Sequence, residues 1–169
     1  MTSNLFRRAF VAGCALALAC ASVPGLLAQS SADVTVREAW AREATTTQPS
    51  TAAYLVLDNK SPRAAALVGV KVAVAGTAEL HTMTMKPGSG MSGMGGGRDM
   101  MTMEKVNEIA IPAGATVELR PGSFHIMLFK LTKAIAAGDS VDLVLEFKDG
   151  STKTVPAKVQ TRASVGYQK

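Results

Sequence analysis

The chain has 169 residues, 5% of them aromatic, and a net charge of +5, a length that suits one compact domain and an export segment. Its charges are scattered singly, with no basic run and no aromatic platform, which argues against nucleic-acid binding. Loss of Arg7 and Arg8 with a leader would leave 16 of the 18 basic residues against 13 acidic ones.

Residues 1–28 have the pattern of an export signal peptide. Arg7 and Arg8 precede the apolar stretch 9–21, which is too short to span a bilayer, and small residues follow it. We expect cleavage after Ala28, with cleavage after Ala21 as the competing prediction. Export would follow the Sec or the twin-arginine route and place the protein in the periplasm, with no stable membrane span after signal removal.

Both cysteines, Cys14 and Cys20, lie in this leader. Cleavage after Ala28 would leave no cysteine in the mature chain, which excludes a disulfide, a thiolate metal site and a cysteine nucleophile. Cys20 also raises the alternative of a lipoprotein signal, although Ala17 stands where such signals usually carry leucine.

The mature chain alternates short strand-like runs with turn residues, and no helix or internal repeat is predicted. After a short linker, 29–33, we expect one domain over 34–159 and a flexible tail over 160–169. Residues 59–62 and Gly76 are predicted turns. The predicted strands are 34–40, 52–58, 67–74, 78–85, 101–111, 116–119, 124–131, 141–147 and 152–159. This pattern predicts an all-β antiparallel sandwich or barrel.

Residues 86–100 interrupt the strand pattern. They contain six glycines, one proline and three methionines, without periodicity. We interpret this segment as a flexible Met/Gly-rich inserted loop.

The two histidines of the mature chain, His81 and His125, are each followed two residues later by a methionine, Met83 and Met127. Side chains two residues apart on a strand point to the same face. Each histidine should therefore project together with its methionine, while the intervening Leu80, Ile126 and Leu128 face the core.

Methionine is concentrated in one region. Eight methionines remain in the mature chain, and seven of them lie between Met83 and Met103. Met101 and Met103 share a face of one predicted strand, so three strand ends could bring imidazoles and thioethers together. The loop methionines Met91 and Met94, with Met100, would either capture additional metal ions or be tolerated loop residues.

This set of side chains favours Cu(I). Soft sulfur and imidazole suit Cu(I), and a thioether binds without titrating near neutral pH. Zinc prefers thiolate, imidazole or carboxylate, and calcium and magnesium require oxygen. Binding of Cu(II) at a secondary site is left open. The alternative interpretation is structural, because a single buried histidine is usually a core residue and methionine usually fills core gaps.

The chain resembles the PCuAC (DUF461) family of periplasmic copper chaperones. That family has a histidine, ten residues, a methionine, 21 residues and His-x-Met. Here 21 residues separate Met103 from His125, and His125-Ile126-Met127 fits the end of the pattern. His81 is followed by 21 residues instead of ten before Met103, and the excess maps onto the inserted loop.

Further stretches of the chain also resemble the family, from about Val34 to Val159. They are Ala39-Trp40-Ala41-Arg42, Thr51-Ala52-Ala53-Tyr54, Glu79-Leu80-His81-Thr82-Met83, Ile111-Pro112-Ala113-Gly114 and Leu119-Arg120-Pro121-Gly122.

The resemblance implies a cupredoxin-like Greek-key β-sandwich with one exposed Cu(I) site. The ligands it implies are His81, Met103, His125 and Met127, with Met83 or Met101 as substitutes for Met103. It also implies delivery of copper to a respiratory oxidase, at the CuA-bearing subunit of cytochrome c oxidase, or to another periplasmic copper carrier. Copper sequestration for tolerance is the alternative function, and a metal-free binding module is a third.

We expect no enzymatic activity. Blue-copper electron transfer needs a cysteine ligand, and the sequence has no G-x-S-x-G motif of a serine hydrolase.

Overall fold

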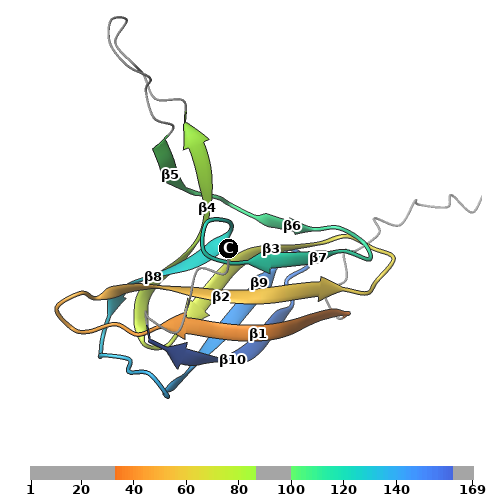
Figure 1. Cartoon of the computed structure of the whole chain (residues 1–169). Helices are drawn as coiled ribbons and strands as arrows, with labels where there is room; N and C mark the ends of the chain where they lie inside the picture. Colours follow the sequence, from red (N-terminus) through yellow and green to blue (C-terminus); the bar gives the residue numbers. More distant parts are fainter. Residues whose placement is uncertain (1–32, 87–99, 162–169) are drawn as a thin grey trace, which may run out of the picture.

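The structure is a computed structural model that describes residues 33–86 and 100–161 (Figure 1). The predicted signal peptide, nearly all of the linker and inserted loop, and most of the tail lie outside the described residues. Within the two described ranges no helix is long and apolar enough to cross a membrane.

Ten β-strands and no helix make up the described part of the chain, which confirms the all-β prediction. They are β1 (Val34–Arg42), β2 (Ser50–Asn59), β3 (Ala65–Val72), β4 (Ala75–Lys86), β5 (Met100–Lys105), β6 (Ile109–Ile111), β7 (Thr116–Leu119), β8 (His125–Leu131), β9 (Ser140–Phe147) and β10 (Thr152–Gln160).

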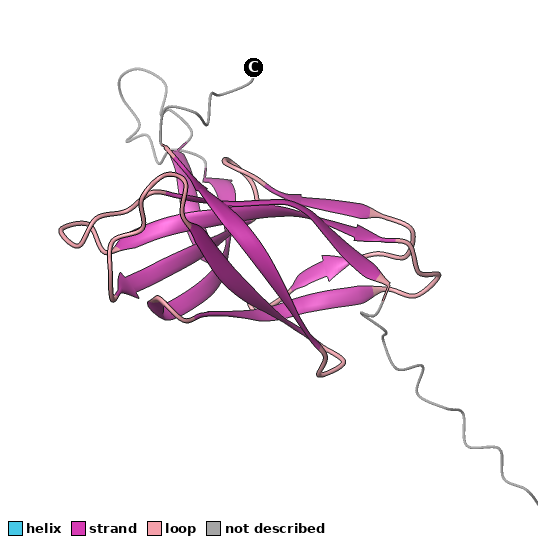
Figure 2. Cartoon of the chain, turned by 90° about the horizontal axis from the view of Figure 1, so that it is seen from below, coloured by secondary structure: helices cyan, strands magenta, loops and turns pink. Residues whose placement is uncertain are grey.

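The strands form one hydrogen-bonded path that folds over into a sandwich and does not close (Figure 2). Its order is β5-β4-β8-β2-β1-β10-β9-β3-β6, and β7 also pairs with β2. One pairing departs from the antiparallel prediction, because β1 and β10 run parallel, with Trp40 opposite Lys158. These are the first and last strands, so no hairpin between them fixes an antiparallel direction.

Two predicted boundaries differ from the structure around β4 and β5. The expected strand 101–111 is split into β5 and β6, and between them the Val106 amide donates to the Leu80 carbonyl at 2.9 Å. The turn predicted at Gly76 is wrong, because Gly76 lies inside β4. A Cβ there would lie 3.1 Å from Cβ of Lys130, so the glycine permits a close approach of two strands.

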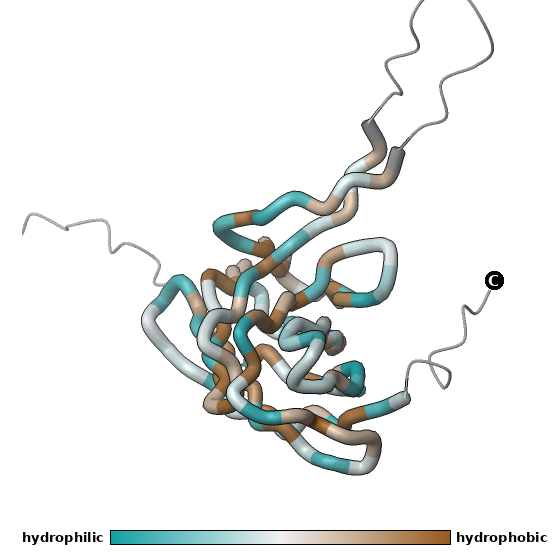
Figure 3. The backbone as a smooth tube through the Cα atoms, turned by 90° about the vertical axis from the view of Figure 1, so that its left-hand side faces the viewer, coloured by the Kyte–Doolittle hydropathy of each residue, from teal (hydrophilic) through white to brown (hydrophobic). Residues whose placement is uncertain are grey.

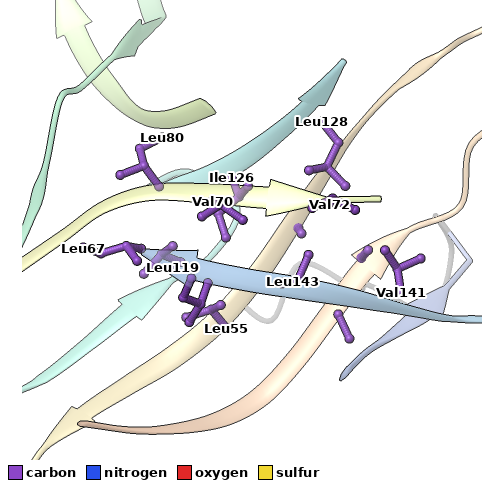
Figure 4. Close-up of a cluster of buried hydrophobic side chains, with 14 of the residues drawn as sticks. Leu55, Leu67, Val70, Val72, Leu80, Leu119, Ile126, Leu128, Val141 and Leu143 are labelled. Atoms are coloured by element: carbon purple, nitrogen blue, oxygen red, sulfur yellow. The ribbon is translucent and has the colours of Figure 1, made fainter. Parts of the chain in front are cut away.

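The core lies between the two layers and is built largely from alternate residues of strands other than β5 (Figure 4). Leu80 of β4 and Ile126 and Leu128 of β8 are at most 3% exposed, which confirms the predicted core face. Because side chains alternate along a strand, the neighbouring residues of β4 and β8 point to the opposite, outer face.

Asn59 ends β2 at a predicted turn and is fully buried. Its Nδ2 donates to the carbonyls of Arg63, Ile111 and Pro112 at 2.8, 3.1 and 3.0 Å, and its Oδ1 accepts from the Ser61 amide at 3.1 Å. Every polar atom of this side chain has a partner, so the residue ties the end of β2 to β6.

Candidate metal centre

The two histidines lie side by side on the outer face of the sheet. His81 of β4 and His125 of β8 are direct cross-strand partners, with ring centroids 5.9 Å apart. His125 is 4% exposed and the side chain of His81 is 12% exposed. Two residues far apart in the chain are thus brought together because β4 and β8 are neighbours in the sheet.

The ring of His125 is oriented by a hydrogen bond to the backbone just before β8. Nδ1 lies 2.9 Å from the Ser123 carbonyl oxygen, which can only accept, so Nδ1 carries the proton. Burial lowers the pKa of His125 below its ordinary 6.5, and the nearby charges of His81 and Arg42 lower it further, against the Ser123 hydrogen bond. The residue is therefore a neutral imidazole whose Nε2 lone pair is free to bind a metal.

The ring of His81 is held by a carboxylate. Its Nε2 lies 3.0 Å from Oε2 of Glu79, whose Oε1 accepts from Lys105 Nζ at 2.8 Å. Hydrogen bonds from Lys105 and then from His81 lower the pKa of Glu79, so this carboxylate is ionised and accepts the Nε2 proton. The other nitrogen, Nδ1, is buried without a hydrogen-bond partner in the described structure.

Thioether sulfur lies next to the histidines. Met127 shares the outer face of β8 with His125, and Met83 of β4 is the direct partner of Met103 of β5. A cavity of about 650 Å³ is lined by Met83, Met103, His125 and Met127 among others. His81 lies next to His125. Among the described residues, the cavity is lined by His125 and not by His81.

Met101 lies further from the histidines than the other predicted ligands. It is paired with Met85, two cross-strand pairs beyond Met83 and Met103, and it is 52% exposed. The structure therefore brings together five of the six candidates, and it places Met83 as well as Met103 beside the cavity.

Aromatic side chains form a wall that sequence analysis did not assign to the site. Trp40 stacks on Tyr54 at 4.3 Å, and the Tyr54 ring lies 6.4 Å from that of His125. Phe129 lies 6.1 Å from His81 on the other side, measured between ring centroids. Trp40 and Tyr54 lie in stretches that resemble the PCuAC family. That resemblance was the only feature of the sequence that pointed to a role for them at the site. Aromatic rings therefore lie next to both imidazoles.

A bulge in β1 aligns this wall. The register of β1 against β2 shifts between Arg37 and Trp40, and Glu38 has a φ of 54°. The shift sets Trp40 directly opposite Tyr54. Bulges of this kind re-aim side chains near functional sites.

Within the described ranges, no three His, Cys, Asp or Glu side chains form a group that could hold a metal. The candidate centre is built instead from two imidazoles and neighbouring thioethers. Such a donor set suits a soft ion, as the sequence predicts.

Comparison with known proteins identifies relatives over the whole chain. Residues 34–159 match the family described as "Putative lipoprotein LpqE-like". The chain is 33% identical to the "Putative lipoprotein Lxx21020" of Leifsonia xyli subsp. xyli over 178 residues, which cover 99% of this chain and 98% of that protein.

Several solved structures share the fold. The solution structure of CuI-DR1885 from Deinococcus radiodurans is 32% identical with a TM-score of 0.57, over 76% of this chain and 79% of that one. The copper-bound PCuAC domain from PmoF2 has a TM-score of 0.61 at 19% identity, over 76% and 93%, which shows the fold alone. The fold is thus cupredoxin-like, as predicted, and the chain belongs to the LpqE-like family.

Proposed function

We propose that this chain is an exported, non-enzymatic Cu(I) chaperone that holds one ion with His81, Met103, His125 and Met127. The observation that carries the proposal is the convergence of the two histidines, as adjacent cross-strand partners, beside a cavity lined by thioethers. The similarity to CuI-DR1885, whose structure is of a Cu(I)-bound protein, supports the same ion here.

The histidines are prepared for the ion in different ways. Nε2 of His125 is free because Nδ1 donates to a carbonyl, and Nδ1 of His81 is free because Nε2 donates to Glu79. Such outer partners orient a ligating imidazole and fix its tautomer. The His125 ring does not have to lose a proton before an ion binds, because burial lowers its pKa.

Release is the second requirement of a chaperone. Thioethers are uncharged, so Met103 and Met127 can leave the ion without separating charge. Met103 is 45% exposed, which lets the ligands of an incoming partner replace it first.

We propose the CuA-bearing subunit of cytochrome c oxidase, or another periplasmic copper carrier, as the recipient. Mixing the Cu(I)-loaded protein with an apo CuA domain and separating the two should move most of the copper to that domain. Retention by this chain would instead support copper sequestration, the alternative function. A His125→Ala variant with little bound copper is the control for non-specific transfer.

Export is part of the proposal. The family description and the relative from Leifsonia xyli both name lipoproteins, which supports Cys20 as a lipidated first residue of the mature chain rather than cleavage after Ala28. The mass of the N-terminal peptide from protein isolated from membranes distinguishes these two outcomes.

A further inference from the structure

The hairpin formed by β4 and β5 carries methionines on one face only. Met83 pairs with Met103, and Met85 pairs with Met101, two cross-strand pairs further along the hairpin. Residues two apart on a strand share a face, so all four thioethers lie on the face that also carries His81. Threonines occupy the alternate positions, and Oγ1 of Thr84 donates to the carbonyl of its partner across the hairpin at 3.4 Å.

This sulfur-bearing face has no packing role in the described structure. The exposed fractions of Met85, Met101 and Met103 are 68%, 52% and 45%, and Val68 is the only other exposed large hydrophobic side chain among the described residues. The hairpin projects away from the sandwich (Figures 1 and 3), and no methionine of the described chain belongs to the buried core cluster. Apolar surface left in water is unfavourable, so packing does not explain these side chains.

The chemistry of the exposed residues is uniform. Each large apolar position on this face of the hairpin is a thioether, and none is leucine, isoleucine or valine. A thioether differs from those side chains chiefly in its soft sulfur lone pairs and its flexibility. Both properties serve the binding of a soft metal ion.

We propose that Met83, Met85 and Met101 form a second, outer site for a soft monovalent ion, Cu(I) or Ag(I), on the projecting hairpin. Side chains directly opposite each other in an antiparallel pair have Cβ atoms about 4.5–5.5 Å apart. The next residue on the same face lies about 7 Å along the strand. Three flexible methionine side chains can span these distances and bring their sulfurs to one ion.

The outer site adjoins the inner centre, and in this respect the inference rests on the proposed function. Met83 of the outer site is the direct partner of Met103, which we assign to the inner ion, and both line the cavity beside His125. An ion can therefore pass between the two sites by exchange of one thioether at a time. No proton or electron has to move, since the ligands that exchange are uncharged and the ion stays monovalent.

Ag(I) titration of the protein labelled with ¹³C at the methionine methyl groups tests this site, with methyl resonances followed by NMR. The first equivalent should shift Met103 and Met127. The second should shift Met83, Met85 and Met101. In a Met85→Leu/Met101→Leu variant, which keeps apolar side chains of similar volume, the second equivalent should no longer bind at concentrations that saturate the unmodified protein.

A Met91→Leu/Met94→Leu variant is the matched control, because it removes the same number of sulfurs from the inserted loop. It should keep the second equivalent on the hairpin. Loss of that equivalent in the loop variant, or its retention in the hairpin variant, would overturn the outer site. A His81→Ala/His125→Ala variant should still shift Met85 and Met101. Failure of Met127 to shift at any equivalent would contradict the inner centre and leave the outer site standing.

Discussion

Asn59 and His81 are both polar side chains buried against β-strands, but their hydrogen bonding differs. Every polar atom of Asn59 has a protein partner. At the candidate metal centre, Nδ1 of His81 and Nε of Arg42 are buried without a partner in the described structure. A buried polar group without a partner costs about 1–3 kcal/mol. The Asn59 corner thus serves stability, whereas the histidine pair leaves Nδ1 of His81, a proposed ligand atom, without a partner at some cost to stability.

The largest expected effect is on copper binding in a His125→Ala variant. It removes a nitrogen ligand outright, so we expect Cu(I) affinity to fall by more than about 100-fold, the upper end of the loss caused by removing only an orienting partner. Competition against a coloured Cu(I) chelator measures the change. An affinity within twofold of the unmodified protein would contradict the assignment.

Asn59→Ala should lower stability and leave Cu(I) affinity unchanged, in contrast to His125→Ala. Three carbonyls and one amide would lose their partner in a fully buried position, so we expect the free energy of unfolding to fall by roughly 2–4 kcal/mol. Urea unfolding of the copper-free protein measures it. Cu(I) affinity of the folded variant should be unchanged, and a loss similar to that of His125→Ala would remove the contrast between the two regions.

A smaller effect is expected from Glu79→Leu. The variant keeps a side chain of similar size but no longer holds Nε2 of His81, so Cu(I) affinity should fall about tenfold. Glu118→Leu is the matched control, because its carboxylate accepts only from exposed Arg120, at 3.2 Å. Equal affinities for the two variants would show that Glu79 does not position His81.

The smallest effect concerns pH. Because burial lowers the pKa of His125, its imidazole becomes protonated at a higher pH in the unfolded chain than in the folded chain. Stability of the copper-free protein should therefore decrease as pH falls from about 8 to about 5. The lowered pKa of Glu79 adds a further loss of stability at still lower pH, below the ordinary Glu pKa of 4.5.

A His125→Gln variant isolates this contribution. Its free energy of unfolding should fall less than that of the unmodified protein over the same range of pH. Parallel pH profiles of the two proteins would show that burial does not hold His125 neutral.

Local patterns in the sequence predicted which face of each strand a residue occupies. Alternation placed Leu80 and Ile126 in the core, and hence His81 and His125 outside, because side-chain direction in a strand has a period of two. The turn residues similarly located most strand ends, including that at Asn59.

The sequence could not predict which strands become neighbours. The pairing of β4 with β8, which joins the histidines, depends on contacts across the whole sandwich. The bulge at Glu38, which brings Trp40 opposite Tyr54, is likewise a product of pairing. The same holds for Gly76, whose role is set by Lys130 on another strand. Local pattern carries no information about such distant partners.

X-ray absorption of the protein loaded with one equivalent of Cu(I) would identify the atoms that bind the ion. We expect two nitrogen and two sulfur neighbours of the ion, with one sulfur lost or replaced in Met103→Leu. A copper environment made only of sulfur, or only of nitrogen and oxygen, would contradict a centre shared by the histidine pair and the thioethers.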